Sequence, residues 1–309
     1  MTVLTQGTAP RPTAVALGLF DGVHLGHRAV LRQAAAHRQE GLLPAVFTFS
    51  ASSVAYKQHR QVQYLYTDAR KQQLLAACGM ELIYSPLFPE IAPLTGEDFS
   101  ARILRDLLRA EVVVCGADFR FGRQAAWGIR ELMRLGQTHG YRVECVPSVQ
   151  LEGEQVSSRR IRQLLTEGMP EQAARLLGED YRVSGRVQHG NQLGRTMGFP
   201  TLNQFFAPGQ CAPRFGVYAS AAYPEGKPLP AVTNIGMRPT IGDTSCPIAE
   251  TYILDWDGTL YDRDVPVALK AFLRPEHRFD GIGALSRQLA RDIAAARTYA
   301  ANHQQEEQQ

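Results

Sequence analysis

The sequence lacks the features of several large classes of protein. Its five cysteines are widely spaced and form no Cys-x-x-Cys pair, so neither a zinc site nor a disulfide framework is indicated. No apolar run approaches the roughly 20 residues that cross a bilayer, and residues 1–12 lack the basic start and apolar stretch of a secretory signal. The net charge of +3 comes from dispersed basic residues and does not indicate nucleic-acid binding. We therefore expect a cytoplasmic protein without membrane or nucleic-acid partners.

The chain does contain enough apolar sequence for a substantial core. It has 309 residues, of which 44% are hydrophobic and 20% are charged. This length and this balance are typical of a soluble chain with two domains.

The first half of the chain alternates between short apolar runs and helical patterns. The expected strands are residues 14–17, 45–49, 82–84, 112–115 and 142–146, and the expected helices are 27–40, 68–78, 98–109 and 129–139. Helices between successive strands imply a mostly parallel sheet that is covered on both faces. Ligands of such sheets bind beyond the carboxyl ends of the strands.

A glycine-bearing run, Gly18-Leu-Phe-Asp-Gly-Val-His-Leu-Gly-His27, follows the first of these strands. Gly22 and Gly26 allow tight turns and close approach of a ligand to the backbone. The following helix directs its N-terminus at the same place, and His24 and His27 can donate hydrogen bonds to phosphate oxygens. An ordinary turn with two surface histidines also fits the short His-x-Gly-His pattern.

Two further stretches follow strands of the first half. Gly116-Ala-Asp-Phe-Arg-Phe-Gly122 combines a carboxylate, an arginine and two aromatic rings, which suits a flat ring that carries a phosphate. A glycine-rich loop with buried phenylalanines is the alternative. Val156-Ser-Ser-Arg-Arg-Ile-Arg162 opens a helix, and its serines also fit simple N-caps.

The hydrophobic pattern of the chain changes from helical to strand-like spacing near residues 178–181. Short strand-like runs at 181–187, 216–222, 231–234, 249–255 and 265–272 predict a small antiparallel barrel. A helix is expected over about 282–301, followed by a disordered polar tail at 303–309. Between the first two runs, Thr201 and Asn203 offer hard oxygen ligands to Mg²⁺ within a glycine-rich stretch.

These motifs together resemble the bacterial bifunctional riboflavin kinase/FMN adenylyltransferase (FAD synthetase) family, over about residues 15–297. Residues 20–27 resemble its phosphate-binding loop, Phe-Asp-Gly-Val-His-x-Gly-His. Residues 194–203 resemble its kinase signature, Gly-Arg-x-x-Gly-Phe-Pro-Thr-Ala-Asn, with Leu202 in place of alanine. The resemblance implies an α/β nucleotidylyltransferase-like (Rossmann-like) domain with adenylyltransferase activity at 1–180. It also implies a riboflavin kinase β-barrel domain with a closing helix at 181–309.

The resemblance also implies the activity and the residues that carry it. The enzyme would phosphorylate riboflavin to FMN with ATP and adenylylate FMN to FAD with a second ATP, releasing pyrophosphate. Its substrates would be riboflavin, FMN and ATP with Mg²⁺, no tightly bound redox cofactor would be required, and the oligomeric state stays open. The implied residues are Glu250, His24 and His27 for catalysis; Phe20, Asp21, Gly22, Gly26, Ser157, Ser158, Arg162, Gly190, Gly194, Arg195 and Pro200 for ATP; Asp118, Phe119, Phe121 and Arg274 for flavin; and Thr201 and Asn203 for the metal.

Two departures from the family pattern leave alternatives open. The family carries Phe-x-Pro-His-Pro after its second strand, where this chain has Phe49-Ser-Ala-Ser-Ser53, and Arg159 replaces a threonine. A monofunctional riboflavin kinase with a weakened adenylyltransferase domain fits these changes, and a non-catalytic flavin- or nucleotide-binding regulator is the other alternative. Residues 255–259 imitate the Asp-x-Asp-Gly-Thr motif of haloacid-dehalogenase-type phosphatases. Too few residues follow them for the α/β domain that this chemistry needs.

Overall fold

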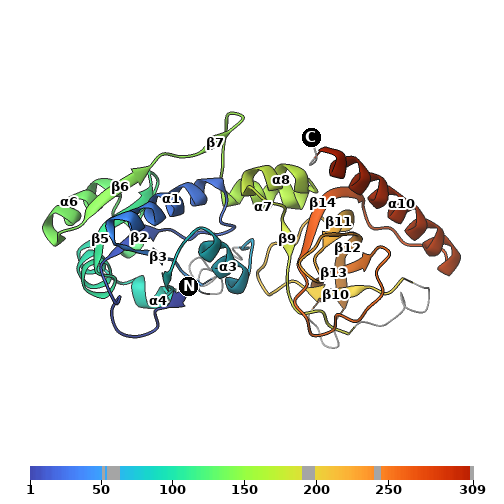
Figure 1. Ribbon diagram of the computed structural model, residues 1–309, viewed down its shortest axis with the longest axis horizontal. Coiled ribbons are helices and arrows are strands. Elements are labelled where there is room, and N and C mark those ends of the chain that lie inside the picture. The colour runs from blue at the N-terminus through green and yellow to red at the C-terminus, as the bar shows by residue number, and fades with distance from the viewer. Residues whose placement is uncertain (51–52, 54–62, 190–198, 240–244, 307–309) are drawn as a thin grey trace. The chain divides into compact units, whose positions relative to one another are not determined.

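The structure is a computed structural model that describes residues 1–50, 53, 63–189, 199–239 and 245–306 of the chain. The chain forms two compact units, residues 1–158 and residues 159–309 (Figure 1). Helices α7 (Ser158–Glu167) and α8 (Pro170–Leu177) precede the expected domain boundary at 180, and α8 packs in the second unit against strand β14 (Val267–Arg274). In the described ranges no helix has the length and apolar character of a membrane span.

The first unit is built on a six-stranded sheet in the order β1-β4-β3-β2-β5-β6, with all neighbours parallel. Its strands are β1 (Thr2–Val3), β2 (Thr13–Leu17), β3 (Leu43–Phe47), β4 (Leu82–Tyr84), β5 (Ala110–Gly116) and β6 (Arg142–Val146). Its helices are α1 (Leu25–Ala36), η1 (His37–Glu40), α3 (Asp68–Ala77), α4 (Phe88–Ile91), α5 (Gly96–Asp98), the π-helix η2 (Phe99–Leu107), η3 (Arg123–Ala125) and α6 (Ile129–His139). A hairpin, β7 (Gln150–Leu151) and β8 (Glu154–Gln155), follows. The predicted parallel α/β architecture is confirmed.

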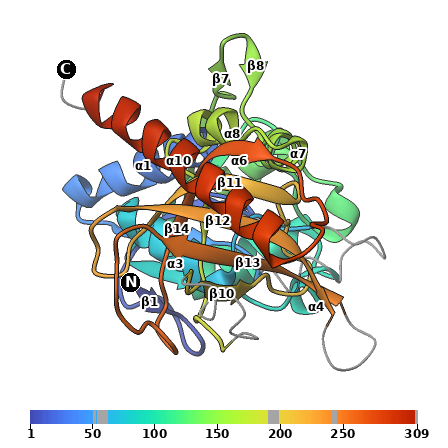
Figure 2. The same cartoon turned by 90° about the vertical axis from the view of Figure 1, so that its right-hand side faces the viewer.

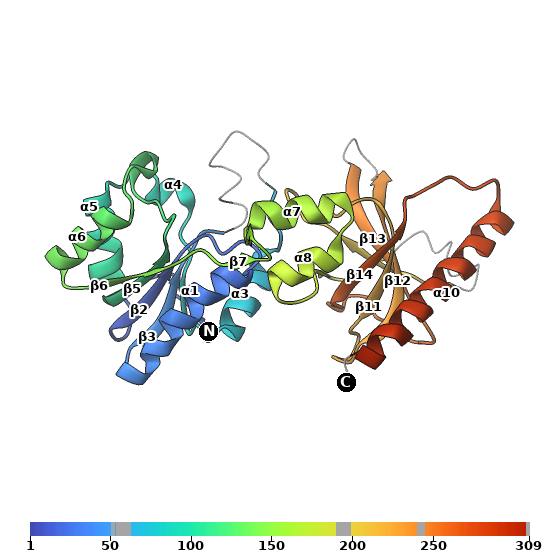
Figure 3. The same ribbon diagram turned by 90° about the horizontal axis from the view of Figure 1, so that it is seen from above.

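Helices cover the central strands of this sheet on both faces, as expected for a parallel sheet (Figure 3). Every residue of β2 and β3 is buried. Val15 and Leu17 point to the face on which Phe99 and Leu132 pack from η2 and α6. Helix α1 contacts β2, β3 and β5 and buries Leu31 completely.

The order of the strands fixes where this unit can bind a ligand. The chain runs outward from β2 through β3 to β4 and then returns to the other side of β2 to form β5. The direction of winding therefore reverses between β2 and β5. Open α/β sheets bind their ligands at such a reversal, beyond the carboxyl ends of the strands.

The second unit contains an antiparallel barrel. The strand order is β10-β13-β12-β11-β14-β9, formed by β9 (Arg182–Val183), β10 (Leu202–Phe205), β11 (Gly216–Ala222), β12 (Leu229–Pro239), β13 (Ser245–Ile253) and β14. The Gln188 amide donates to the Asn203 carbonyl at 2.9 Å, so the chain that leaves β9 pairs with β10 at the opposite edge of the sheet. This pairing closes most of the barrel and confirms the predicted fold class.

One long helix, α10 (Ile282–Glu306), lies across the outer face of β11 and β12 (Figure 2). Ala296 and Ile293 of α10 pack there against Val217 and Val232. The predicted disorder from residue 303 onward is wrong for residues 303–306, which continue α10. His303 is held in the helix because its ring stacks on Tyr299 with ring centroids 3.9 Å apart.

Candidate active sites

The loop between β2 and α1 lies at the reversal of the parallel sheet and has an unusual backbone. Phe20 and Val23 adopt positive φ angles of 50° and 45°, a region that is costly for residues other than glycine. Gly22 also has a positive φ, of 83°. The Asp21 carboxylate accepts the Leu65 amide proton at 2.8 Å, which holds the loop against the chain that enters α3. A strained backbone of this kind is typical of functional loops.

A distant serine fixes the same loop. The Ser158 hydroxyl donates to the Asp21 carbonyl at 2.8 Å, across 137 residues of sequence. The predicted residues Asp21 and Ser158 are therefore brought together. Ser157 adjoins Ser158, while Arg162 lies on α7, in the second unit. Gly26 lies between His24 and the backbone of Val156, because a Cβ atom there would stand 3.2 Å from the His24 ring and 3.8 Å from the Val156 carbonyl oxygen.

The two histidines of the loop stack on each other, with ring centroids 3.6 Å apart and an angle of 17° between the rings. His24 is the N-cap of α1, and its Nδ1 accepts the His27 amide proton at 3.3 Å. Burial lowers the pKa of His24 to about 4. Burial also holds the pKa of His27 well below its ordinary value, with smaller effects from His24 and Lys71. Both imidazoles are therefore neutral at pH 7 and can offer a hydrogen bond but no positive charge.

The segment after β5 lies at the same reversal of the sheet. Asp118 is exposed, whereas Phe121 is 6% exposed and packs in the core against Phe99 and Trp127. Phe119 stacks on Phe121 with centroids 5.9 Å apart. Of the three predicted flavin residues of this segment, Asp118 and Phe119 are therefore more accessible than Phe121, and the flavin contact stays a prediction.

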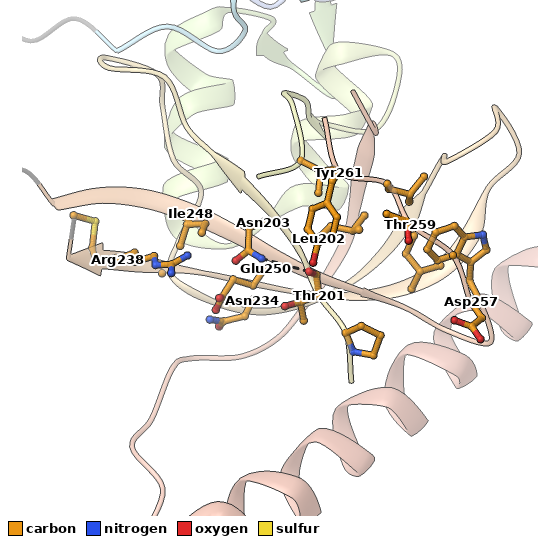
Figure 4. Close-up of a pocket in the computed structure, with 18 of the residues that line it drawn as sticks. Thr201, Leu202, Asn203, Asn234, Arg238, Ile248, Glu250, Asp257, Thr259 and Tyr261 are labelled. Carbon is orange, nitrogen blue, oxygen red and sulfur yellow. Dashed lines mark hydrogen bonds between the residues drawn. The ribbon is translucent and has the colours of Figure 1, made fainter. Parts of the chain in front are cut away.

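The second site lies on the barrel and contains the predicted base. Asn203, Glu250 and Asn234 are direct cross-strand partners on β10, β13 and β12, so their side chains form one row on the same face of the sheet. Figure 4 shows this row with Thr201 beside it. The structure therefore brings Glu250, Thr201 and Asn203 together, and their roles in catalysis and metal binding stay predictions. Gly190, Gly194 and Arg195, predicted to bind ATP, lie outside the described residues.

Two cavities meet at this row. The first, of about 340 Å³, is lined by polar residues that include Thr201, Asn203, Arg238 and Asp257, and it also contains the exposed Pro200. The second, of about 290 Å³, lies between the sheet and α10. Its apolar and aromatic lining includes Phe199, Tyr252, Phe279, Leu285 and Leu289. Thr201, Asn234, Glu250 and Glu276 line both cavities, so a group bound in one can meet a group bound in the other at these four residues.

The environment of Glu250 suits a proton acceptor. Burial raises the pKa of Glu250, and the Glu276 carboxylate raises it further, while Arg238 and a hydrogen bond from Asn234 oppose the shift. Asn234 also donates to Glu276 at 3.2 Å. A carboxylate whose pKa is raised towards neutrality is a stronger general base than an exposed one.

Arg274 stands in the second cavity in a fixed orientation. Its Nε and Nη2 donate to the Asp292 carboxylate at 3.0 and 2.7 Å, and Asp292 is 3% exposed. Gln288 donates to the same carboxylate at 2.9 Å. The Arg274 guanidinium also lies 5.7 Å from the centroid of the Phe279 ring. The predicted flavin residue Arg274 therefore faces an aromatic cavity and is held by a buried partner.

Sequence reasoning singled out neither Asn234 nor Glu276 as a site residue, although both lie in stretches that match the family. It also passed over Lys71, which is 5% exposed near the histidine loop. Lys71 occupies an ordinary position in the first turn of a helix, and only tertiary burial distinguishes it. Asp255, the nucleophile of the phosphatase alternative, is instead an exposed turn residue that pairs with Arg297.

Comparison with known proteins identifies both units. A riboflavin kinase model matches residues 177–300, and an FAD synthetase model matches residues 6–160. Curated relatives named bifunctional riboflavin kinase/FMN adenylyltransferase include that of Listeria monocytogenes, 34% identical over 92% of this chain and 91% of the relative. That of Escherichia coli K12 is 35% identical over the same shares. A crystal structure described as a macrolide-efflux protein from Streptococcus pneumoniae superposes with a TM-score of 0.82, at 29% identity over 94% of this chain and 95% of that one. The chain belongs to the bifunctional riboflavin kinase/FMN adenylyltransferase family.

Proposed function

We propose that the barrel unit phosphorylates riboflavin with ATP and that the parallel-sheet unit then joins the resulting FMN to the adenylyl group of a second ATP. The observation that carries the kinase assignment is the position of Glu250, which lines both a polar and an aromatic cavity. Phosphoryl transfer between two substrates requires such a meeting point. Family membership supports both activities. We assign residues 1–180 to adenylyl transfer and residues 181–309 to the kinase.

In the kinase reaction, the terminal hydroxyl of the riboflavin side chain attacks the γ-phosphorus of ATP. Glu250 accepts the hydroxyl proton as the new P–O bond forms and the bond to ADP breaks. The isoalloxazine ring would occupy the cavity of Tyr252 and Phe279, and ATP the cavity of Arg238. Because phosphoryl transfer needs little covalent help from the protein, the residues act mainly by positioning and by electrostatic stabilisation.

The residues beside Glu250 fit a divalent metal that accompanies ATP. The Asn203 amide nitrogen donates to the Thr201 carbonyl at 3.4 Å, which turns the amide oxygen away from that carbonyl. The Thr201 hydroxyl and the Asn203 amide oxygen are neutral, hard ligands of the kind that Mg²⁺ accepts alongside phosphate oxygens. When bound, the metal would offset the charge of the phosphates, and we propose Thr201 and Asn203 as its protein ligands.

In the adenylyl transfer, an FMN phosphate oxygen attacks the α-phosphorus of ATP and pyrophosphate leaves. The neutral rings of His24 and His27 can donate hydrogen bonds to the developing charge, and the loop amides can bind the polyphosphate. Ser158 holds the loop through Asp21, and Ser157 precedes it at the entry to α7. No covalent intermediate with the enzyme is needed.

Incubating the chain with riboflavin, ATP and Mg²⁺ and resolving the flavins tests this proposal. We expect FMN to appear first with one ADP for each molecule, and FAD to follow with one pyrophosphate for each molecule. Formation of FMN and ADP without FAD or pyrophosphate would contradict the adenylyl transfer and favour a monofunctional kinase. No turnover of either flavin would contradict the enzyme assignment altogether.

A further inference from the structure

The histidine loop has a shortage of positive charge for a polyphosphate ligand. Its two imidazoles are neutral at pH 7, and Asp21 adds a negative charge. Arg28 of α1 donates from Nε to the Val23 carbonyl at 3.0 Å and so holds the backbone of the loop. The described residues directly after β3, Thr48, Phe49 and Ser50, carry no positive charge.

Lys71 places an ammonium group at this edge. It lies in the first turn of α3, which Thr67 caps by accepting the Arg70 amide proton. The Lys71 Nζ donates to the carbonyl of Phe49, two residues beyond the end of β3, at 2.5 Å. The carboxyl ends of β3 and β2 adjoin each other in the sheet, and Thr48 joins them by donating to the Leu19 carbonyl at 2.9 Å. The ammonium group is therefore next to the histidine loop.

Electrostatic coupling between Lys71 and the loop supports this placement. The positive charge of Lys71 helps to lower the pKa of His27. The negative charge of Asp21 acts to raise the pKa of Lys71 and so favours its charged form. The Asp21 carboxylate is fixed by the Leu65 amide, six residues before Lys71. The loop and the start of α3 thus form one cluster of polar groups.

The protein compensates the charge of Lys71 only in part. Burial lowers the pKa of Lys71, whereas Asp68, 3.5 Å away and partly exposed, favours the charged form. An ammonium group has three protons to donate, and among the described residues Phe49 and Asp68 are its partners. The Nδ1 of His27 is buried nearby and has no partner in the described part of the chain. The third ammonium proton of Lys71 and the Nδ1 of His27 are thus both without a partner among the described residues. A buried cation with a proton left to donate is suited to bind an anion.

We infer that Lys71 is a phosphate-binding residue of the parallel-sheet site, donating a hydrogen bond to the polyphosphate of ATP and to the pyrophosphate product. This inference rests on the proposed adenylyl transfer. It assigns to α3 a positive charge that the neutral histidines of the loop do not provide.

Replacing Lys71 by methionine tests the inference, with Lys227→Met as the matched control. Lys227 is an exposed lysine of the second unit, so its loss removes the same charge far along the chain from the loop. A hydrogen bond to a charged group is worth a factor of about 10 to 100. We expect kcat/KM for ATP in FAD formation from FMN to fall by that factor in Lys71→Met, and Lys71→Arg to recover part of it. FMN formation from riboflavin should stay within about twofold in all three variants.

A direct measurement distinguishes phosphate binding from a purely structural role. The chain has four lysines, so labelling lysine at Cε gives four resonances, and Lys71→Arg identifies the signal of Lys71. Adding magnesium pyrophosphate to the wild-type chain should shift the Lys71 resonance and raise the pKa of its ammonium group, while the Lys227 resonance stays in place.

The outcomes separate the inference from the function on which it rests. An unmoved Lys71 resonance at saturating pyrophosphate, in a chain that makes FAD, would overturn the role of Lys71. So would a Lys71→Met variant that makes FAD as well as Lys227→Met does. If the wild-type chain makes no FAD from FMN, the adenylyl transfer itself fails.

Discussion

The neutral state of His24 has a consequence for stability that can be measured. The folded pKa of about 4 lies below the ordinary value of 6.5, so the unfolded chain binds the proton first as the pH falls. The free energy of unfolding therefore has its full value above about pH 6.5, where His24 is neutral in both states, and it decreases as the pH falls from 6.5 to 4. With these two pKa values, linkage gives a loss of about 2 kcal/mol between pH 7.5 and pH 5 from this one group.

The variant His24→Asn isolates this contribution. Asparagine is a favoured N-cap, so it can still accept the His27 amide proton while it cannot titrate. The chain has two tryptophans, Trp127 in the first unit and Trp256 in the second. In a Trp256→Phe background, the fluorescence of Trp127 during denaturation by urea therefore reports the unfolding of the first unit alone.

We expect the free energy of unfolding to fall by about 2 kcal/mol more in the chain with His24 than in the His24→Asn variant between these two pH values. The carboxylates of the unit titrate in both chains, and their effects cancel in the comparison. Equal losses in the two chains would refute the reasoning, because they would mean that the histidine has its ordinary pKa and is partly charged near neutral pH.

Two further predictions concern the barrel site. In Gly236→Ala the new methyl group would overlap the carboxylate of Glu276, which is an exposed side chain and can turn away. We therefore expect the free energy of unfolding of the second unit, read from Trp256 fluorescence, to change by less than about 0.5 kcal/mol. FMN formation should fall because the Glu276 carboxylate leaves its place beside Glu250, and unchanged turnover would count against a role for this carboxylate in the site. In Asp292→Asn the Arg274 guanidinium loses its charged partner. We expect the KM for riboflavin to rise roughly tenfold while the KM for ATP is unchanged. A rise in the KM for ATP alone would contradict the assignment of the second cavity to flavin.

Much of the architecture follows from local sequence signals. The strands Leu82–Tyr84, Arg142–Val146 and Gly216–Ala222 and the helix Ile129–His139 have the predicted limits. A clear C-cap signal explains the agreement at the helix, because Gly140 ends it with a left-handed φ of 83°.

Other elements have no clear signal in the sequence. Strand β10 (Leu202–Phe205) carries the polar residues of a site and does not alternate in hydrophobicity, so only its pairing with β13 reveals it. Strand β1 has two exposed residues at the edge of the sheet. The predicted helix 98–109 is instead a short α-helix followed by the π-helix η2, whose hydrogen-bond pattern has no counterpart in residue spacing.

Some residues of the candidate sites could be predicted from the sequence, and others could not. Sequence motifs located Glu250, Thr201 and His24, because each of these residues lies in a contiguous stretch that matches the family pattern. They could not locate Lys71, whose importance depends on burial and on neighbours 22 and 50 residues earlier in the chain, Phe49 and Asp21. Tertiary placement alone distinguishes such a residue from any other lysine on a helix.

The central claim is that two separate sites in one chain act in succession on a flavin, and the variant Glu250→Gln tests it most directly. Glutamine keeps the shape of the side chain and removes the proton acceptor, which is worth about 10²–10⁴ in rate. With riboflavin and ATP the variant should form FMN at least about a hundredfold more slowly than the wild-type chain. Supplied with FMN and ATP, it should form FAD within about twofold of the wild-type rate. Undiminished FMN formation, or a parallel loss of both products in a folded variant, would contradict the account.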